Sequence, residues 1–332
     1  MGRISLLFVF LIGFYSCDFI EHAEEMVLPS SSGKYGEVLV VIDTIHEKSK
    51  SGKILKQIFY KEIDALPQKE PMFRMATVVP NDFKSILKRS RNILIVTIGE
   101  GNKNSIIINE DVWAKDQMLI EVNASTDEKA SEILAKNTIA IQNYFNDKEI
   151  QRLQEQYSIK PDRKLSEIIE KRFDLKILLP PAFVMMDSSG NGLWLKKEKQ
   201  IGEHTLLQGL IIYELPYESD STFSNNQMIK SRNDFCKTHI QGGREDSYMS
   251  VYEEFNPIKE EVNLNELYAV SYRGLWNMKN DFMGGPFVHY TFVDVERQRV
   301  IHADGFVYAP KFNKREYLRE LKAILKTIKL KN

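Results

Sequence analysis

The stretch that decides the fold is FVHYTFVDVERQRVIHADGFVYA, residues 287–309. Both halves are rich in aromatic and β-branched residues, which is typical of strands, and the polar pair Glu296 and Arg297 lies between them. A two-residue turn at this pair makes the strands antiparallel neighbours, with positions equidistant from the turn opposite each other. The stretch therefore predicts a β-hairpin, and the hairpin predicts an antiparallel sheet.

The sequence around this hairpin is also rich in strands. Strand-like runs lie at residues 182–187, 193–197, 206–215, 248–253 and 267–276, and helical patterns lie at 225–240 and 313–328. Because strand follows strand with short turns, we expect a mostly antiparallel sheet with helices on one face.

The first half of the chain alternates strands with helices. The patterns predict strands at 37–43, 73–79, 92–98, 105–109 and 118–122, and helices at 52–63 and 81–88. A long helix begins at the capping box of Ser125 and Glu128, and Pro161 opens a second one. The expected class is α+β, with a mixed α/β N-terminal half joined by long helices to the antiparallel half.

The first seventeen residues indicate export. Arg3 precedes an apolar run at residues 4–15, which is too short for a membrane-spanning helix and fits a secretory signal. The following Ser16 and Cys17 resemble the end of a bacterial lipobox, although Phe14 and Tyr15 are unusual there. We expect a signal peptide at 1–16, a lipid on Cys17, a flexible tether at 17–36, and domains at 37–158 and 159–332. An ordinary cleaved signal and an uncleaved anchor remain alternatives.

Composition excludes several classes of protein. The chain has 45 basic and 46 acidic residues and no basic stripe, so we expect no nucleic-acid partner. Its two cysteines are Cys17 and Cys236, which excludes a disulfide framework. The Gly-rich segments lack phosphate-loop spacing, and we expect neither a cofactor nor a metal.

One polar cluster could carry chemistry. The hairpin register places His289 opposite Asp304, with His302 diagonal to His289 on the same face. Two imidazoles and a carboxylate can serve acid–base catalysis or bind a metal. Polar pairs on a surface strand would explain the pattern more simply. We therefore keep His289, His302 and Asp304 only as the candidate site of an alternative function, that of an envelope hydrolase.

Two further groups are candidates for ligand binding. Arg91, Arg273 and Arg315 can line a cleft for an anion, although surface ion pairs would also account for them. Trp113 and Trp276 can stack on sugar rings, which would make the protein glycan-binding, although core packing is the simpler interpretation.

Several short runs resemble domain-of-unknown-function family 4837, found in predicted lipoproteins of Bacteroidota. These runs are LPSSSG (28–33), GE (36–37), LPQ (66–68), EPMF (70–73), RNI (91–93), WAKDQ (113–117), RGLW (273–276), GGPF (284–287), GFVYAP (305–310) and KR (314–315). The resemblance covers nearly the whole mature chain and implies a lipoprotein of the bacterial cell envelope, with no assigned activity. We expect a non-catalytic binding or scaffolding protein, anchored to the inner or outer membrane with its body periplasmic or surface-exposed, and with an envelope protein as a possible partner.

Overall fold

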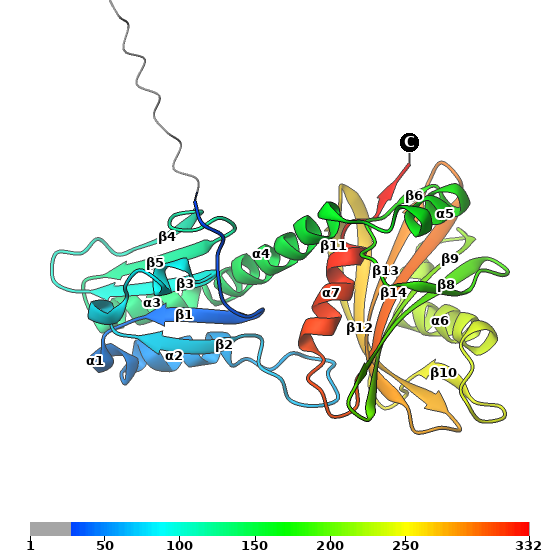
Figure 1. Cartoon of the computed structure of the whole chain (residues 1–332), viewed down its shortest axis with the longest axis horizontal. Coiled ribbons are helices and arrows are strands. Elements are labelled where there is room, and N and C mark those ends of the chain that lie inside the picture. Colours follow the sequence, from blue (N-terminus) through cyan, green and yellow to red (C-terminus); the bar gives the residue numbers. More distant parts are fainter. Residues whose placement is uncertain (1–27, 332) are drawn as a thin grey trace, which may run out of the picture.

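The computed structural model describes residues 28–331, so the signal peptide and Cys17 lie outside the described residues. The described chain forms two lobes, and the helix α4 (Thr138–Ile159) runs from one lobe to the other (Figure 1). None of the helices in the described part is long and apolar enough to cross a membrane.

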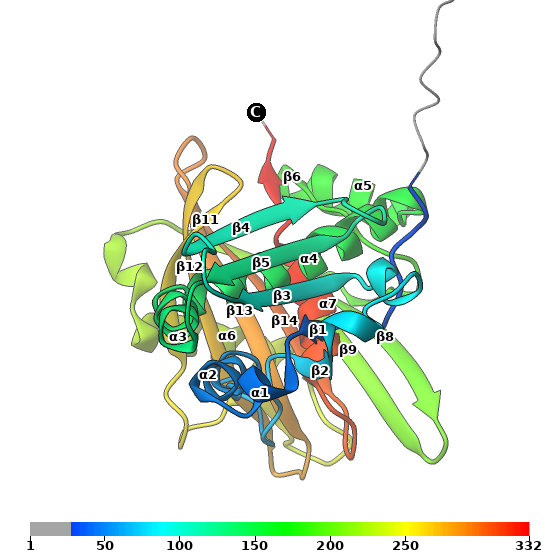
Figure 2. The same cartoon turned by 90° about the vertical axis from the view of Figure 1, so that its left-hand side faces the viewer.

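The N-terminal lobe is built on a five-stranded sheet in the order β2-β1-β3-β5-β4 (Figure 2). Its strands are β1 (Glu37–Val41), β2 (Arg74–Val78), β3 (Asn92–Ile98), β4 (Ser105–Glu110) and β5 (Met118–Ala124). The pairs β1–β2, β1–β3 and β3–β5 are parallel, whereas the edge strand β4 is antiparallel to β5.

Helices cover one face of this sheet. They are α1 (Thr44–Glu47), α2 (Lys50–Phe59), α3 (Asp127–Lys136) and the first turns of α4. Phe59, Phe73 and Phe145 pack edge to face or tilted in the core between the sheet and α2 and α4. The other face carries a smaller core that includes Phe83 and Trp113.

Two helix predictions in this half were wrong in detail. The predicted helix at 81–88 is a pair of 3₁₀ turns, Pro80–Asp82 and Leu87–Arg89, and Ile86 between them is 77% exposed. The predicted long helix is divided into α3 and α4 at Asn137, and Thr126 rather than Ser125 caps α3 by accepting a hydrogen bond from the Lys129 amide.

The C-terminal lobe is a curled antiparallel sheet in the order β10-β12-β13-β14-β9-β8-β7, with β11 also paired to β12. Its strands are β7 (Val184–Asp187), β8 (Gly192–Ile201), β9 (His204–Pro216), β10 (Tyr248–Val251), β11 (Ile258–Leu264), β12 (Leu267–Lys279), β13 (Gly284–Asp294) and β14 (Arg299–Tyr308). A small separate sheet pairs β6 (Leu175–Lys176) with β15 (Lys329–Leu330). The class is α+β, as predicted, although β11 was not anticipated.

Helices cover both faces of this sheet, not one face as expected. α5 (Arg163–Phe173) and α7 (Arg315–Leu325) contribute to the core on one side. α6 (Asn225–His239) packs on the opposite side through Met228, Phe235 and Cys236. The strand β13 is buried along most of its length because both of its faces are covered.

The hairpin of β13 and β14 has the register that the sequence predicts. His289 pairs with Asp304 and Thr291 pairs with His302, and the ladder runs to Asp294 and Arg299 on either side of the turn. The three polar candidates of this hairpin therefore share one face of the sheet, the face that α6 covers.

The described part of the predicted tether is bonded to the N-terminal lobe. The Ser32 amide donates to the Arg89 carbonyl at 2.8 Å, and the Lys115 amide donates to the Pro29 carbonyl at 2.8 Å. Residues 29–32 are thus held beside the two loops that carry Arg89 and Lys115.

Candidate functional site

A loop of the N-terminal lobe caps the first helix turn of α7 in the other lobe. The buried carboxylate of Glu70 accepts hydrogen bonds from the Lys314 amide at 2.7 Å and from the Arg315 amide at 2.9 Å. A carboxylate at a helix N-terminus satisfies free amides and interacts favourably with the helix dipole. The cap therefore fixes α7 against the N-terminal lobe.

Gly36 allows the two lobes to come close beside this cap. A Cβ atom there would lie 2.5 Å from Oε1 of Glu316 and 3.0 Å from the guanidinium groups of Arg315 and Arg319. The backbone of Gly36 also has φ of +65°, which glycine adopts without strain.

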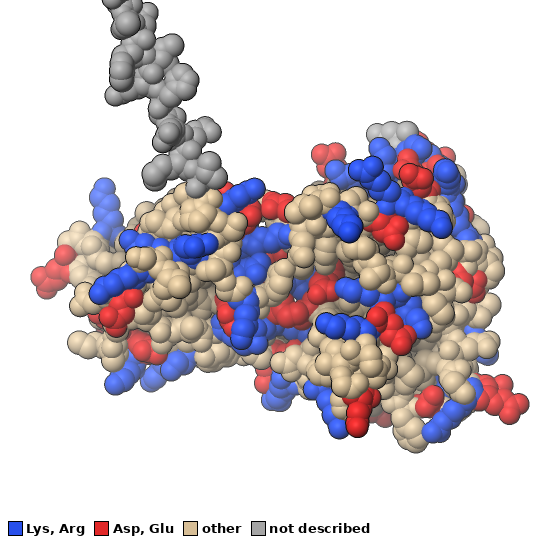
Figure 3. All heavy atoms as spheres, viewed as in Figure 1, with Lys and Arg blue, Asp and Glu red and all other residues tan. Residues whose placement is uncertain are grey.

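A cavity of about 290 Å³ lies between the lobes next to this contact, and we call it the interlobe cleft. Its apolar lining is Ile63, Leu66, Met72, Ile139, Val288 and Leu318. Its polar lining is Lys61, Gln142, Asn143, Asn146, Glu260, Arg273, Arg315, Arg319 and Lys322. Figure 3 shows Lys and Arg atoms between the two lobes, with Asp and Glu atoms beside them.

Two of the cleft's five basic side chains are neutralised by neighbours. Arg315 contacts Glu316 at 2.6 Å and donates to the Pro71 carbonyl at 2.6 Å, and Arg319 also pairs with Glu316. Burial would raise the pKa of Glu316, but Arg319 and Arg315 outweigh it and hold that pKa below its usual value. This arrangement leaves Arg315 and Arg319 as an ordered wall of the cleft.

Arg273 and Lys322 are less well compensated. Nη2 of Arg273 lies 3.8 Å from Glu260, while its Nε is buried and, within residues 28–331, has no hydrogen-bond partner. The Lys322 ammonium group has no carboxylate within ion-pair distance among the described residues, where Asp147 and Glu260 influence it only from further away. A buried unpaired donor such as Arg273 Nε is costly, and the half-buried ammonium of Lys322 lies in the same cavity without an ion-pair partner, so both groups are suited to an added anion.

The protonation of Lys322 is shifted by this environment. Its pKa is lowered to about 8, chiefly because the side chain is buried. The positive charges of Lys326 and Arg273 also lower the pKa, and the negative charges of Asp147 and Glu260 oppose them. An anion bound beside Lys322 would favour the charged ammonium form.

The structure brings together two of the three predicted arginines. Arg273 and Arg315 line the interlobe cleft. Arg91 instead lies 3.1 Å from the buried carboxylate of Glu149 and 4.3 Å from the ring of Tyr35. Arg152 pairs with the same carboxylate at 3.0 Å, so Arg91 belongs to a network that holds α4 on the N-terminal lobe.

The histidine cluster forms a buried network with a residue that the sequence did not indicate. Nδ1 of His289 lies 3.0 Å from Asp304, and its Nε2 lies 3.1 Å from Nδ1 of His302. Arg232 of α6 donates to the same Asp304 carboxylate at 2.9 and 3.3 Å. All four side chains are fully buried, so the cluster is not the surface feature that the simpler interpretation assumed.

Electrostatics favour neutral imidazoles beside an Arg–Asp ion pair. Burial lowers the pKa of His302 well below its usual value, and burial also lowers the pKa of His289 despite the opposing effect of Asp304. Burial would raise the pKa of Asp304, but Arg232 and His289 outweigh it and lower the pKa. The guanidinium of Arg232 supplies the cation beside Asp304, and in the described part of the chain no group of three or more His, Cys, Asp or Glu side chains is arranged to hold a metal.

The two halves of the chain match two different protein families. Residues 162–327 match the family described as Domain of unknown function (DUF4837). The chain belongs to this family. Residues 31–158 match a different one, Domain of unknown function (DUF8532), so the DUF4837 match covers the C-terminal half rather than nearly the whole mature chain. Neither description assigns an activity.

Comparisons with individual proteins add little. No curated protein matches the chain. A solved structure of a mutant of protein Mog1 aligns at 9% identity with a TM-score of 0.32, covering 48% of this chain and 92% of that chain. The Ran-binding protein Mog1p of Saccharomyces cerevisiae aligns at 10% identity with a TM-score of 0.33, covering 48% and 91%. Similarity at this level carries no argument about function.

The tryptophan candidates of this DUF4837 protein lie in different lobes. Trp113 is half-buried and packs edge to face on Phe83 at 5.6 Å. Trp276 is 2% exposed and donates from its indole to the Val307 carbonyl at 3.3 Å. The two rings therefore do not form a common platform.

Sequence reasoning did not single out Glu70, Arg319 or Lys322 as site residues. The helical pattern places Lys322 on a solvated face of the closing helix because its position is away from the apolar side. Nothing in the local pattern shows that the N-terminal lobe covers this face. The sequence gives one indication of this contact between the lobes. Two of the runs quoted for the family resemblance, EPMF and KR, contain the two partners of the cap, Glu70 and Arg315.

Proposed function

We propose that this DUF4837 protein is a lipid-anchored protein of the bacterial envelope that binds an anionic ligand, without catalysis, in the interlobe cleft. The observation that carries the binding function is the pair Arg273 and Lys322, whose donors face one cavity without full compensation. A folded protein retains such groups at a cost in stability, which is the common signature of a binding site.

The cleft also indicates the chemical class of the ligand. The cationic groups of Arg273 and Lys322 suit a carboxylate or a phosphate. Ile63, Ile139 and the other apolar residues supply a surface for a small hydrocarbon portion. A cavity of about 290 Å³ fits a small anion with a short apolar group rather than a polymer chain.

The envelope location is supported by the first seventeen residues. The apolar run at 4–15 and the cysteine at position 17 fit an exported lipoprotein, and acylation of Cys17 would hold the protein on a membrane. Mass spectrometry of the mature N-terminal peptide tests this part, because an acylated Cys17 supports it and a free Asp18 or an intact Met1 contradicts it.

Calorimetric titration with phenyl phosphate and benzoate tests the binding function. We expect saturable binding of at least one probe to the wild-type protein and a loss of at least about tenfold in affinity for Arg273→Gln and Lys322→Gln, since charged hydrogen bonds contribute about 1.5–3 kcal/mol each. Lys329→Gln removes an exposed lysine near the end of the chain and serves as the charge-matched control.

The control variant should bind as the wild type does. An equal loss of affinity in all three variants would mean that only the net charge of the protein matters. If the wild type binds neither probe, there is no anion site in the cleft.

A further inference from the structure

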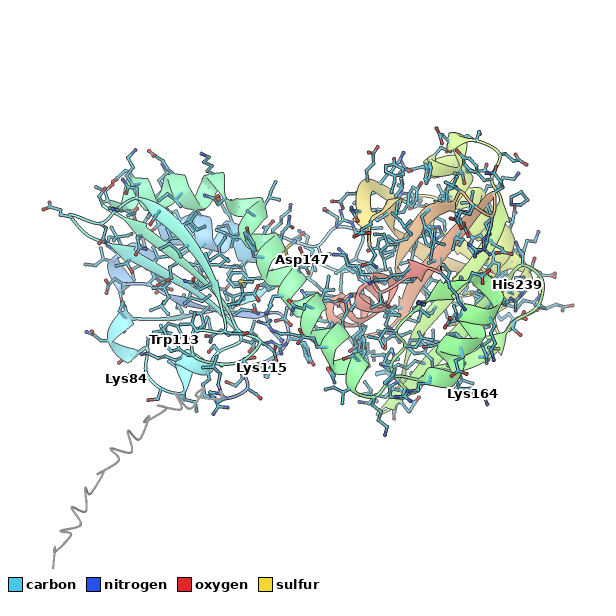
Figure 4. All side chains as sticks on the ribbon, turned by 90° about the horizontal axis from the view of Figure 1, so that it is seen from above. Lys84, Trp113, Lys115, Asp147, Lys164 and His239 are labelled. Carbon is cyan, nitrogen blue, oxygen red and sulfur yellow. The ribbon has the colours of Figure 1, made fainter. Side chains whose placement is uncertain are left out.

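The described chain begins at one side of the N-terminal lobe, beside two loops. Ser30 and Ser32 form backbone bridges to Lys115 and Ser90, and Arg89 donates from its guanidinium to the Ser30 carbonyl at 3.1 Å. Figure 4 shows Lys84, Trp113 and Lys115 along this same side of the lobe.

Basic and apolar side chains are exposed together on these loops. We call this set the anchor-side surface, and it consists of Phe83, Lys84, Ile86, Lys88, Arg89, Val112, Trp113 and Lys115. Lys84, Arg89 and Lys115 are exposed, and Ile86 and Val112 are 77% and 37% exposed. The acidic residues of the two loops are Asp82, Asp111 and Asp116, fewer than the basic ones.

Local packing holds these residues in place. The Lys88 ammonium lies 5.4 Å from the centre of the Trp113 ring, and the Phe83 ring packs on the same indole. Gln117 is buried and donates to the carbonyls of Lys88 and Ser90, both at 2.7 Å, which joins the two loops. The exposed Ile86 thus projects from a fixed scaffold.

Chain length sets how far this surface can lie from the anchor. Leu28 follows Cys17 by eleven positions. A polypeptide spans at most about 3.5 Å per residue, so Leu28 lies within about 40 Å of the acylated residue. The side of the lobe where residues 29–32 are bonded is therefore the part of the body closest along the chain to the membrane.

We propose that the anchor-side surface docks on the membrane that holds the lipid anchor, with its cations on anionic lipid headgroups and Ile86 in the interfacial layer. This inference rests on the acylation of Cys17 in the proposed function. Basic side chains near an anionic bilayer are attracted to its surface charge, and an exposed apolar side chain beside them adds interfacial burial. Docking would hold the interlobe cleft at a set orientation relative to the bilayer.

Lysine-modification footprinting tests the docking. The mature acylated chain, residues 17–332, is bound to vesicles of phosphatidylcholine with or without phosphatidylglycerol and treated with a water-soluble acetylating reagent. We expect Lys84 and Lys115 to react several-fold more slowly on vesicles with phosphatidylglycerol than on phosphatidylcholine alone. Lys56, which is exposed on α2 on the opposite face of the N-terminal sheet, is the internal control and should react equally on both.

The outcomes separate the docking from the anchor. If the acylated chain binds vesicles but Lys84 and Lys115 are no more protected than Lys56, each compared with its rate in the free protein, the docking is wrong while the anchor stands. If the purified protein carries no lipid on Cys17, the anchor itself is wrong. Protection that occurs only in native envelopes and not on either vesicle would assign the surface to a protein partner and overturn the membrane docking.

Discussion

Replacement of Lys322 by Met should make the protein more stable and weaken anion binding in the cleft by at least about tenfold. Met keeps the unbranched apolar stem of Lys322 and removes its ammonium group, which has no carboxylate within ion-pair distance among residues 28–331. The gain in stability and the loss of anion affinity have the same cause. A charge that lacks a partner until the ligand binds destabilises the ligand-free protein.

The magnitude follows from the pKa of Lys322. A decrease from 10.5 to about 8 makes the charged form about 3 kcal/mol less favourable in the folded protein than in the unfolded chain, at about 1.4 kcal/mol per pH unit. The side chain retains some solvent exposure, so we expect about half of this value. The variant should therefore be about 1.5 kcal/mol more stable than the wild type at about pH 7.

The pH dependence identifies the cause. Below about pH 8 Lys322 is charged in both folded and unfolded chains, and the full cost is present. Between about pH 8 and pH 10.5 the folded protein loses the proton first, so the unfolded chain binds more protons and wild-type stability rises with pH. The difference between variant and wild type should thus shrink between about pH 7 and pH 9.5.

Urea unfolding followed by circular dichroism at both pH values measures this difference, with Lys329→Met as the control for loss of an exposed lysine. A Lys322→Met variant that is less stable than the wild type at about pH 7, or a difference that does not change with pH, would refute the reasoning.

Three other predictions concern the scaffold. Glu70→Ala should cost about 2 kcal/mol in urea unfolding because α7 loses its cap, whereas Glu62→Ala, at an exposed ion pair, should cost less than about 0.5 kcal/mol; equal costs would argue against the cap. Arg232→Met should lower stability by about 3–5 kcal/mol by leaving the Asp304 carboxylate buried without its partner, and the added change Asp304→Asn should recover part of it, which thermal unfolding can measure. Because burial lowers the pKa of His302, the unfolded chain binds a proton first on acidification, and the free energy of unfolding should fall below about pH 6.5. His302→Asn should reduce the slope of unfolding free energy against pH in this range, and an unchanged slope would exclude His302 as its source.

Local features of the fold could be predicted from the sequence. The register of the β13–β14 hairpin follows from turn position alone, so the predicted neighbours of His289 are the ones that the hairpin contains. Ser224 directly precedes the helical pattern at 225–240, where a serine favours an N-cap, and its hydroxyl accepts a hydrogen bond from the Gln227 amide.

The covering of both sheet faces also has a signal in the sequence. Along β13, Phe287 and Thr291 point to one face and Val288 and Phe292 to the other, so apolar residues occur on both. Strands with apolar residues on both faces are typical of sheets covered on both sides. The same pattern agrees with a histidine cluster inside the protein, whereas the expectation of a surface strand considered only one face of the hairpin.

The interlobe contacts could not be predicted in this way. Glu70 and Arg315 are 245 positions apart and belong to different lobes, so no periodicity relates them. The environment of Lys322 depends on how the N-terminal lobe lies against α7. The helical pattern of α7 indicates only which of its faces packs on the sheet of its own lobe. Site residues that arise from packing between lobes need the structure.

The measurement that tests the central claim most directly is the titration of the Lys322 amine by NMR, after reductive ¹³C-methylation of the lysines and assignment with the Lys322→Gln variant. Without ligand, the Lys322 resonance should titrate with a pKa of about 8. The probe that binds in the calorimetric titration, phenyl phosphate or benzoate, should raise this pKa and leave the exposed Lys329 unaffected, because an anion in the cleft favours the charged ammonium. A Lys322 resonance whose titration is the same with and without the probe would contradict an anion-binding cleft.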